Sequence, residues 1–230
     1  EYLKLKHKGV VPTLMADGQP VNESTLICEF LDETYPEPSL MPADAYGRTR
    51  MRLWSKKVDE GLFEGVMELS FSAMFRERVK NMTDAQRDQR FANVGDPRRR
   101  DRVMSTYQDG VASPYVLHGI AAYEKAFKTM EKELSDGRPW LLGEQFTLAD
   151  INMMPFVARL GYLGLLDIWL AERPLVQGWR ERALARPSFA AGITDYFGPG
   201  EVDEMKEFGA KIKDQVVERY AEYLEQFPAK

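Results

Sequence analysis

Cysteine is nearly absent from this 230-residue chain, which contains a single one, Cys28. One cysteine excludes an intramolecular disulfide framework and is typical of a protein kept in a reducing compartment, so we expect a cytoplasmic location. Cys28 follows Ile27 in the body of a predicted helix, where we expect a small core side chain rather than a nucleophile.

No apolar run approaches the roughly 20 residues that span a bilayer, and the first residues carry no signal-peptide pattern, so no membrane partner is expected.

An excess of positive charge is also missing, because 36 Asp and Glu outweigh 31 Lys and Arg for a net charge of -5. Such a chain lacks the electrostatic footprint of a general nucleic-acid binder. The run Arg98 to Arg100 is the exception, and it follows Asp96-Pro97, which predicts a helix N-cap and a proline at the first helical position. We therefore interpret this run as a solvated helix face. The chain does not begin with methionine, so we expect it to be either a fragment or the visible part of a longer protein.

Hydrophobic patterning changes near residue 40. Before that point short β-type runs alternate with turns, whereas apolar residues recur three and four apart after Asp44. The sequence therefore predicts an α/β piece over residues 1–40 and an all-α domain over residues 41–230. Two short strands and one helix bury too little surface to stand alone, so we expect chain N-terminal to Glu1, together with docking on the helical domain, to complete the small domain.

The α/β piece has a clear local order. Val10, Val11, Thr13 and Leu14 form a β-branched run, and Asp17-Gly18 predicts a hairpin turn before a strand from Gln19 to Val21. A helix is predicted to begin near Ser24 and to stop at the prolines Pro36 and Pro38. The apolar residues expected on one face of this helix are Leu26, Ile27, Phe30 and Leu31.

Two signals organise the helical part. Thr147 to Asp150 predicts a capping box, in which Thr147 and Asp150 each accept from the other's backbone amide, and Phe146 is placed to pack on Ile151 as a hydrophobic staple. The segment 201–230 predicts one long terminal helix that braces the domain. Its apolar stripe is expected to contain Val202, Met205, Phe208, Ile212, Val216, Tyr220 and Leu224.

Taken in order, these motifs resemble the cytosolic glutathione transferases. The resemblance is carried by Gly9-Val10-Val11-Pro12-Thr13-Leu14, Asp17-Gly18, Glu23-Ser24, Leu31-Asp32-Glu33-Thr34-Tyr35-Pro36, the Phe146 to Ile151 box, Pro174 and Arg186-Pro187-Ser188-Phe189. It implies an α/β thioredoxin-like N-terminal domain, incomplete in this chain, followed by an all-α C-terminal helical domain. The helix from Trp54 to Glu60 and the insertion from Asn81 to Tyr115 look most like the bacterial and fungal branch that includes the lignin β-etherases.

The resemblance also implies a glutathione site. Val11 would pair its main chain with the cysteinyl portion, as an added strand does, and Pro12 would be cis. Ser24, at a helix N-terminus, would hold the γ-glutamyl carboxylate, and Glu23 would accept from the γ-glutamyl amine. Lys8, with Lys6 or His7 as alternatives, would meet the glycyl carboxylate. Each has a plainer use, because prolines often sit in turns and a Glu-Ser pair often caps a helix.

Catalysis in this family needs a thiolate, which a donor in the first strand-to-helix turn of the thioredoxin-like domain makes available. That turn precedes Glu1, so the thiol-activating residue is unknown and expected outside this chain. A hydrophobic pocket for a second substrate is expected on the first helices of the second domain, from Met67, Phe71, Phe75 and Tyr115. Met74 shares the same spacing, and core packing is the alternative use of each residue.

Three hypotheses about function follow. The first is a glutathione transferase that uses glutathione as co-substrate, without a metal, to attack a hydrophobic electrophile. The second is a narrower form of it, glutathione-dependent cleavage of an aryl ether with a phenolate as leaving group. The third is a non-catalytic binding protein with the same fold. In each case the family implies a homodimer, for which a symmetric contact is expected.

Overall fold

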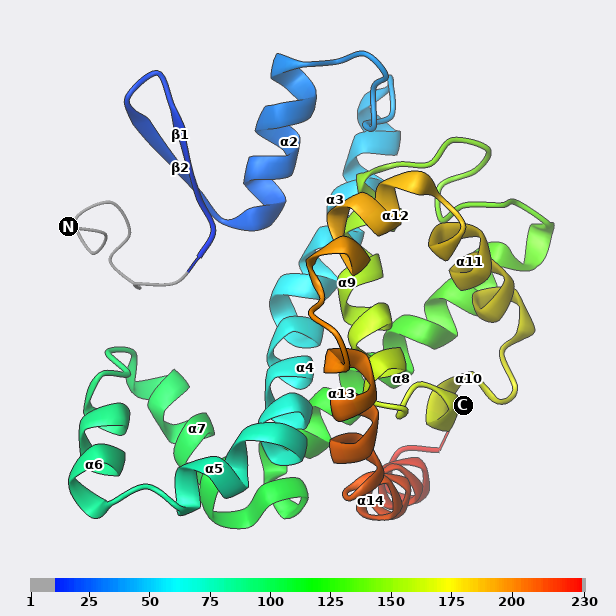
Figure 1. Ribbon diagram of the computed structural model, residues 1–230. Helices are drawn as coiled ribbons and strands as arrows, with labels where there is room; N and C mark the ends of the chain where they lie inside the picture. The colour runs from blue at the N-terminus through cyan, green and yellow to red at the C-terminus, as the bar shows by residue number, and fades with distance from the viewer. Residues whose placement is uncertain (1–10, 229–230) are drawn as a thin grey trace.

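The computed structural model describes residues 11–228 and consists of a small β-hairpin and helix joined to a large helical domain (Figure 1). Strands β1 (Thr13–Ala16) and β2 (Gln19–Asn22) pair antiparallel, with Leu14 opposite Val21. Asp17 and Gly18 form the predicted turn, with φ values of 48° and 79°. Two successive positive φ values define the tight turn that matches the twist of a hairpin, which confirms the prediction from Asp17-Gly18.

The first strand begins later than predicted. It starts at Thr13, whereas Val11 lies in a bend before it and is 81% exposed, and Val10 lies outside the described residues. The peptide between Val11 and Pro12 is cis, as the resemblance implied. Pro12 has no N–H to donate to a neighbouring strand, so the regular ladder cannot run through it.

Helix α2 (Ser24–Thr34) ends just before Pro36, as expected, but its buried face differs from the prediction. Ile27 is buried, whereas Leu26 is 56% and Leu31 39% exposed. The carboxylate of Asp32 is buried instead and accepts a hydrogen bond of 2.6 Å from the backbone N–H of Leu40. The helix packs on α9 (Leu148–Tyr162) of the large domain, and this docking, rather than the apolar positions alone, selects the buried side.

The helical domain begins with an almost unbroken succession of helical segments. These are α3 (Ala45–Lys57), the π-helical η1 (Val58–Leu62), α4 (Phe63–Ser70), the π-helical η2 (Phe71–Phe75) and α5 (Arg76–Lys80). The insertion seen in the sequence folds into α6 (Asp84–Ala92) and α7 (Pro97–Asp109), which form a lobe on the same side of α3 and α4 as the hairpin (Figure 1). The predicted cap of α7 is confirmed, because the Asp96 carboxylate accepts from the amides of Arg98 and Arg99, and the arginine run is exposed.

The remaining helices follow α7 in the chain. They are α8 (Pro114–Glu133), α9 (Leu148–Tyr162), α10 (Asp167–Leu170), α11 (Pro174–Leu184), α12 (Pro187–Gly192), α13 (Glu201–Ala210) and α14 (Lys213–Gln226), with short 3-10 turns η3 (Gly110–Ala112), η4 (Leu134–Asp136) and η5 (Thr194–Tyr196). Helices α4 and α8 cross where Gly65 meets Gly119, and a Cβ added to Gly119 would lie 2.5 Å from the Gly65 Cα. This backbone contact leaves no room for a side chain at Gly119, so it sets how closely α4 packs against α8.

The start of α9 confirms the predicted capping box. Asp150 is fully buried, and its carboxylate accepts from the amides of Thr147 and Leu141, each at 3.0 Å, and from the indole Nε1 of Trp179 at 2.8 Å. Burial raises the pKa of Asp150, while these hydrogen bonds act in the opposite direction. The ring of Phe146 lies edge-on to Trp140 with a centroid distance of 4.7 Å. The motif therefore joins three segments of the core rather than capping α9 alone.

The single terminal helix predicted over residues 201–230 is wrong, since the chain forms α13 and α14 with a break at Lys211 and Ile212. Gly209 approaches the backbone of Leu163 so closely that an added Cβ would meet the Leu163 carbonyl oxygen at 1.7 Å. Helix α13 docks on α9 and η2, whereas α14 packs on α8, so the two segments follow different surfaces. Of the predicted stripe, Met205, Ile212 and Val216 are buried and Phe208 and Tyr220 are half-buried, whereas Val202 and Leu224 at the ends are exposed.

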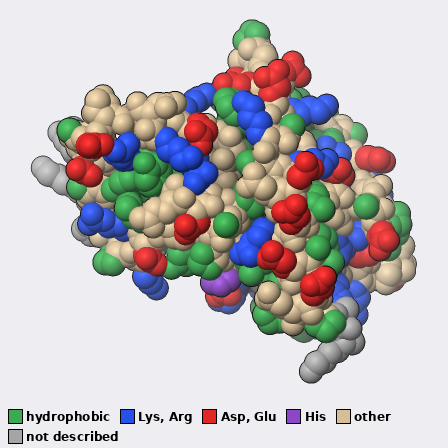
Figure 2. All heavy atoms as spheres, turned by 90° about the horizontal axis from the view of Figure 1, so that it is seen from below, with side chains coloured by type: hydrophobic (Ala, Val, Ile, Leu, Met, Phe, Trp, Pro, Cys, Tyr) green, Lys and Arg blue, Asp and Glu red, His purple; other side chains and the backbone are tan. Residues whose placement is uncertain are grey.

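The surface is charged and mixed. The face seen from below in Figure 2 carries Lys and Arg side chains interspersed with Asp and Glu, rather than one continuous basic patch. Within residues 11–228, no helix has the length and apolar character needed to cross a membrane.

Candidate functional site

The N-terminus of α2 has an unusual backbone. Glu23, the residue before the helix, has φ 68° and ψ 118°, a positive φ that is rare for a residue with a Cβ. The Glu23 side chain makes no capping hydrogen bond to the helix, and the first turn of the helix contains no acidic residue. The first amides of a helix have no partner within the helix, so this helix N-terminus, without a cap from Glu23, is suited to an anionic ligand. Backbone strain of this kind is concentrated at binding and catalytic sites.

The hairpin brings four of the predicted glutathione residues to one place. Thr13, the first residue of β1, pairs with Asn22, the last residue of β2. Val11-Pro12 and Glu23-Ser24 therefore emerge at the same end of the hairpin, and both Val11 and Ser24 are exposed there. Lys8, together with its alternatives Lys6 and His7, lies outside the described residues.

One further carboxylate lies at this end. Asp59, from η1, accepts a hydrogen bond of 3.3 Å from the hydroxyl of Thr25 in the first turn of α2. Burial raises the pKa of Asp59, and the negative charge of Glu23 raises it further. Asp59 thus connects the helical domain to the predicted glutathione site. The sequence carried no signal for this contact, because 34 positions separate the two residues.

The predicted second-substrate residues form a stripe along α4 and η2. Met67 is 49% exposed, Phe75 is 37% exposed, and Phe71 between them is half-buried. Phe63, which is 51% exposed, extends the stripe by one more step of four residues and packs edge-on against Phe156 of α9 at 6.5 Å. The four-residue spacing was a sufficient signal for Phe63, although the prediction did not include it.

Tyr115 lies beside a charged cluster rather than in the stripe. Its ring covers the guanidinium of Arg102 at 4.8 Å, and its hydroxyl donates to the Asp101 carboxylate. Arg102 in turn pairs with Glu68 at 2.6 Å and with Glu64 at 3.2 Å. The cluster therefore connects α7 and the start of α8 to α4, next to Met67.

Glu68 is a candidate site residue that the prediction missed. Its side chain is 7% exposed, and its Oε2 atom has no hydrogen-bond partner among the described residues. Burial raises the pKa of Glu68 to about 7, even though Arg102 opposes the rise. The available signal was a lone carboxylate within an otherwise uncharged, mostly apolar run from Gly65 to Phe75.

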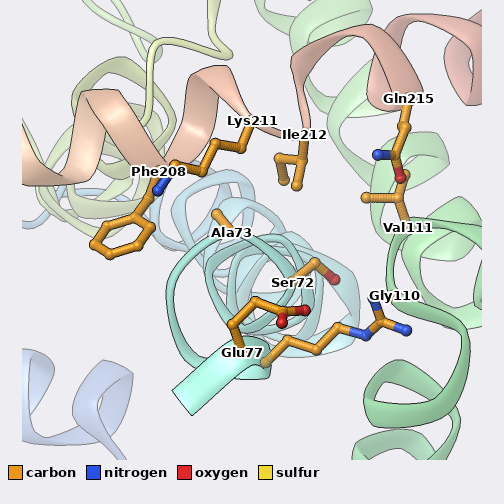
Figure 3. A pocket seen from close by; sticks show the side chains of 10 residues that line it. Ser72, Ala73, Glu77, Gly110, Val111, Phe208, Lys211, Ile212 and Gln215 are labelled. Carbon is orange, nitrogen blue, oxygen red and sulfur yellow. The ribbon is translucent and has the colours of Figure 1, made fainter. Parts of the chain in front are cut away.

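A separate hollow of about 240 Å³ lies where η2 meets η3 and the junction of α13 and α14 (Figure 3). Ser72 and Ala73 are the η2 residues that line it, and the residues around it include none of the predicted second-substrate residues.

Cys28 is half-buried, and burial raises the pKa of its thiol, so it is a poor nucleophile. Among residues 11–228, no group of three His, Cys, Asp or Glu side chains could hold a metal ion.

Comparison with known proteins identifies the family. Residues 1–39 match the N-terminal domain of glutathione S-transferases, and residues 84–182 match their C-terminal domain. A probable glutathione S-transferase of Glycine max is 34% identical over 193 residues, which cover 80% of this chain and 68% of the relative. The chain therefore belongs to the glutathione S-transferase family and has its fold, a thioredoxin-like region followed by a helical domain.

Within that family the chain is similar to protein LigF of a Sphingobium species. The two are 29% identical over 195 residues, which cover 81% of this chain and 74% of LigF. The crystal structure of the β-etherase LigF matches 84% of this chain and 81% of its own with a TM-score of 0.72 and 26% identity. A glutathione S-transferase from Rhodospirillum rubrum shares the fold with a TM-score of 0.59 and 24% identity over 88% of this chain and 81% of its own.

Proposed function

We propose that this protein is a glutathione transferase that joins glutathione to a hydrophobic electrophile. The observation that carries the proposal is that Val11-Pro12 and the N-terminus of α2, which Glu23 does not cap, lie at the same end of the hairpin. An exposed main-chain edge beside an anion-binding helix end is the arrangement that a short peptide with a carboxylate requires. Family membership supports glutathione as that peptide.

Each residue receives a definite role in this proposal. The main chain of Val11 pairs with the cysteinyl portion of glutathione, and the cis peptide at Pro12 directs that edge toward the ligand. The Ser24 hydroxyl and the first amides of α2 bind the γ-glutamyl carboxylate, while Glu23 accepts from the γ-glutamyl amine. Lys8 meets the glycyl carboxylate. Residues 1–40 act as the glutathione-binding domain and residues 41–230 as the domain that binds the electrophile.

The chemical step is a nucleophilic attack. The glutathione thiolate forms a new carbon–sulfur bond, the leaving group departs with the electron pair of the bond that breaks, and the thiol proton passes to solvent. Phe63, Met67, Phe71 and Phe75 supply the apolar surface for the electrophile, next to Tyr115. We place the group that lowers the thiol pKa N-terminal to Glu1.

Cleavage of a β-aryl ether is the second candidate. It is favoured by the similarity to the β-etherase LigF, whose TM-score of 0.72 exceeds the 0.59 of the Rhodospirillum rubrum transferase. In this reaction the thiolate attacks the carbon that bears the aryloxy group, and a phenolate leaves.

We also propose a cytoplasmic homodimer, in which the small domain of one subunit contacts the helical domain of the other. Sedimentation as a monomer at micromolar concentration would contradict the homodimer.

Glutathione binding to the intact protein tests the site. Calorimetry should show that Ser24→Ala weakens binding about tenfold, because it removes a hydroxyl donor to the γ-glutamyl carboxylate, and that Glu23→Gln weakens it by a similar factor, because it removes the negative charge that faces the γ-glutamyl amine. Glu33→Gln is the matched control for Glu23, since Glu33 lies on the exposed side of the same helix, and it should leave the Kd unchanged. Equal affinity in the wild type and in both site variants would contradict the proposed glutathione site.

Thiol ionisation and turnover separate an enzyme from a binding protein. The ultraviolet absorbance of bound glutathione should show a thiolate at neutral pH, and a panel of aryl halides, epoxides and aryl ethers should contain a substrate. Turnover of aryl ethers in preference to the other classes would select the second candidate. Tight glutathione binding without thiolate absorbance, and without a Ser, Tyr, Thr or Cys in the turn that precedes Glu1, would assign a non-catalytic binding role.

A further inference from the structure

Arg159, on α9, is a half-buried cation whose partners are all neutral. Its Nε donates to the hydroxyl of Ser70 at 3.1 Å, and its two terminal nitrogens contact the sulfurs of Met205 at 2.7 Å and Met74 at 3.2 Å. In the part of the chain that the structure describes, no carboxylate pairs with this guanidinium. Burial is the sole cause that lowers its pKa, which agrees with the absence of a neighbouring negative charge.

The contacts of Arg159 do not favour the folded state. A guanidinium presents five N–H donors, and a thioether sulfur is a weak acceptor, so the two methionines satisfy the group poorly. A half-buried charge without a counter-ion loses part of its hydration without compensation, whereas an apolar side chain at this position would not carry that cost. Residues that break a stability rule in this way are concentrated at functional sites.

The position of Arg159 places it near the second substrate rather than near the glutathione anchor. Ser70 and Met74 lie on α4 and η2, among the residues of the apolar stripe. Phe156, one turn before Arg159 on α9, packs on Phe63 at the start of that stripe. Ser70 lies 11 positions after Asp59, where the helical domain touches the first turn of α2, a distance of roughly 15 Å along the helical segments.

We propose that Arg159 binds a carboxylate on the second substrate, so that the enzyme selects aromatic electrophiles that carry a negative charge. The aromatic part would lie on the stripe that contains Phe63 and Met67, and the carboxylate would replace the sulfur contacts with charge-assisted hydrogen bonds to the guanidinium. This assignment rests on the proposed glutathione transfer and names the class of its acceptor.

Two glutathione conjugates that differ in one group provide the test. S-(4-carboxy-2-nitrophenyl)glutathione carries the anion, and its 4-carboxamide counterpart has nearly the same shape without the charge. Calorimetry on the intact protein should show at least about tenfold tighter binding of the carboxylate. Arg159→Met should abolish this preference, and Arg159→Lys should retain part of it. Arg99→Met, on the exposed face of α7, should leave it unchanged.

A thermal unfolding measurement separates this role from a structural one. Arg159→Met should keep or raise the wild-type Tm, because it removes an uncompensated charge, whereas a structural arginine would lower the Tm when replaced. An equal preference in the wild type and in Arg159→Met, no preference in the wild type, or failure of either conjugate to bind would each overturn the assignment. Turnover of 4-chloro-3-nitrobenzoate and its amide tests the chemistry separately, because absent turnover with an intact binding preference would overturn the proposed transfer alone.

Discussion

The Glu68 carboxylate allows a quantitative prediction about stability and pH. Burial raises its pKa from 4.5 to about 7, against the opposing effect of Arg102 and with a smaller contribution from the negative charge of Glu64. Its side chain is only 7% exposed, so solvent screens this effect weakly. The folded state therefore holds a proton on Glu68 more tightly than the unfolded state does, and ionisation of this group destabilises the fold.

The sign and magnitude follow from linkage. A group whose pKa is raised on folding contributes its stability below the unfolded pKa and loses it as the pH rises through the folded pKa, so the relevant window extends from about 4.5 to about 7. The difference between 4.5 and about 7 corresponds to about 3 kcal/mol, most of which develops between pH 5 and pH 7. Glutamine resembles the protonated carboxyl group and can still accept from Arg102. Glu68→Gln should therefore gain about 2 to 3 kcal/mol relative to the wild type over that range.

Urea unfolding of the intact protein at pH 5, 6, 7 and 8 measures this gain. The quantity of interest is the difference in unfolding free energy between Glu68→Gln and the wild type at each pH. Glu64→Gln removes the more exposed carboxylate of the same arginine, and it should change stability by less than about 1 kcal/mol at any of these pH values. A difference for Glu68→Gln that stays flat, or that shifts toward the wild type as the pH rises, would refute the assignment of a buried, raised-pKa carboxylate.

Three other perturbations test the framework around the site. Gly119→Ala should lower the unfolding free energy by about 2 kcal/mol or more because its Cβ would clash with Gly65, whereas Gly95→Ala, with open space around it, should be neutral in the same assay. Asp150→Ala should cost about 3 kcal/mol or more in chemical unfolding, since four buried donors lose their acceptor. Thr25→Val should weaken glutathione binding about threefold in calorimetry by releasing Asp59 from the first turn of α2, and an unchanged Kd would contradict that link.

Local signals in the sequence predicted local structure well. Asp17-Gly18 predicted the hairpin turn because two positive φ values are needed there, and glycine and aspartate tolerate them. The Thr147 to Asp150 box and the Asp96-Pro97 cap predicted helix starts because both hydrogen-bond patterns close within a few residues. The family motifs likewise indicated the correct fold.

Predictions that depended on distant parts of the chain were less successful. The apolar positions of α2 suggested one buried face, yet docking on α9 leaves Leu26 exposed and buries Asp32. The continuous stripe in residues 201–230 suggested one helix, because periodicity does not record that Gly209 must approach the Leu163 carbonyl. The same limit applies to the candidate site, where Asp59 and Thr25 are 34 positions apart.

The charges that flank the apolar stripe show why distant contacts matter for function. Glu68 and Ser70, the residue that positions Arg159, are separated by two positions, so they lie on different sides of α4 and do not face each other. The acid is paired with Arg102 from α7, and the Arg159 guanidinium on the other side has only neutral partners. Because the helix holds the two groups apart, neither can neutralise the other. An incoming substrate would therefore meet an apolar surface with one uncompensated positive group, which is the condition for selecting an anionic electrophile.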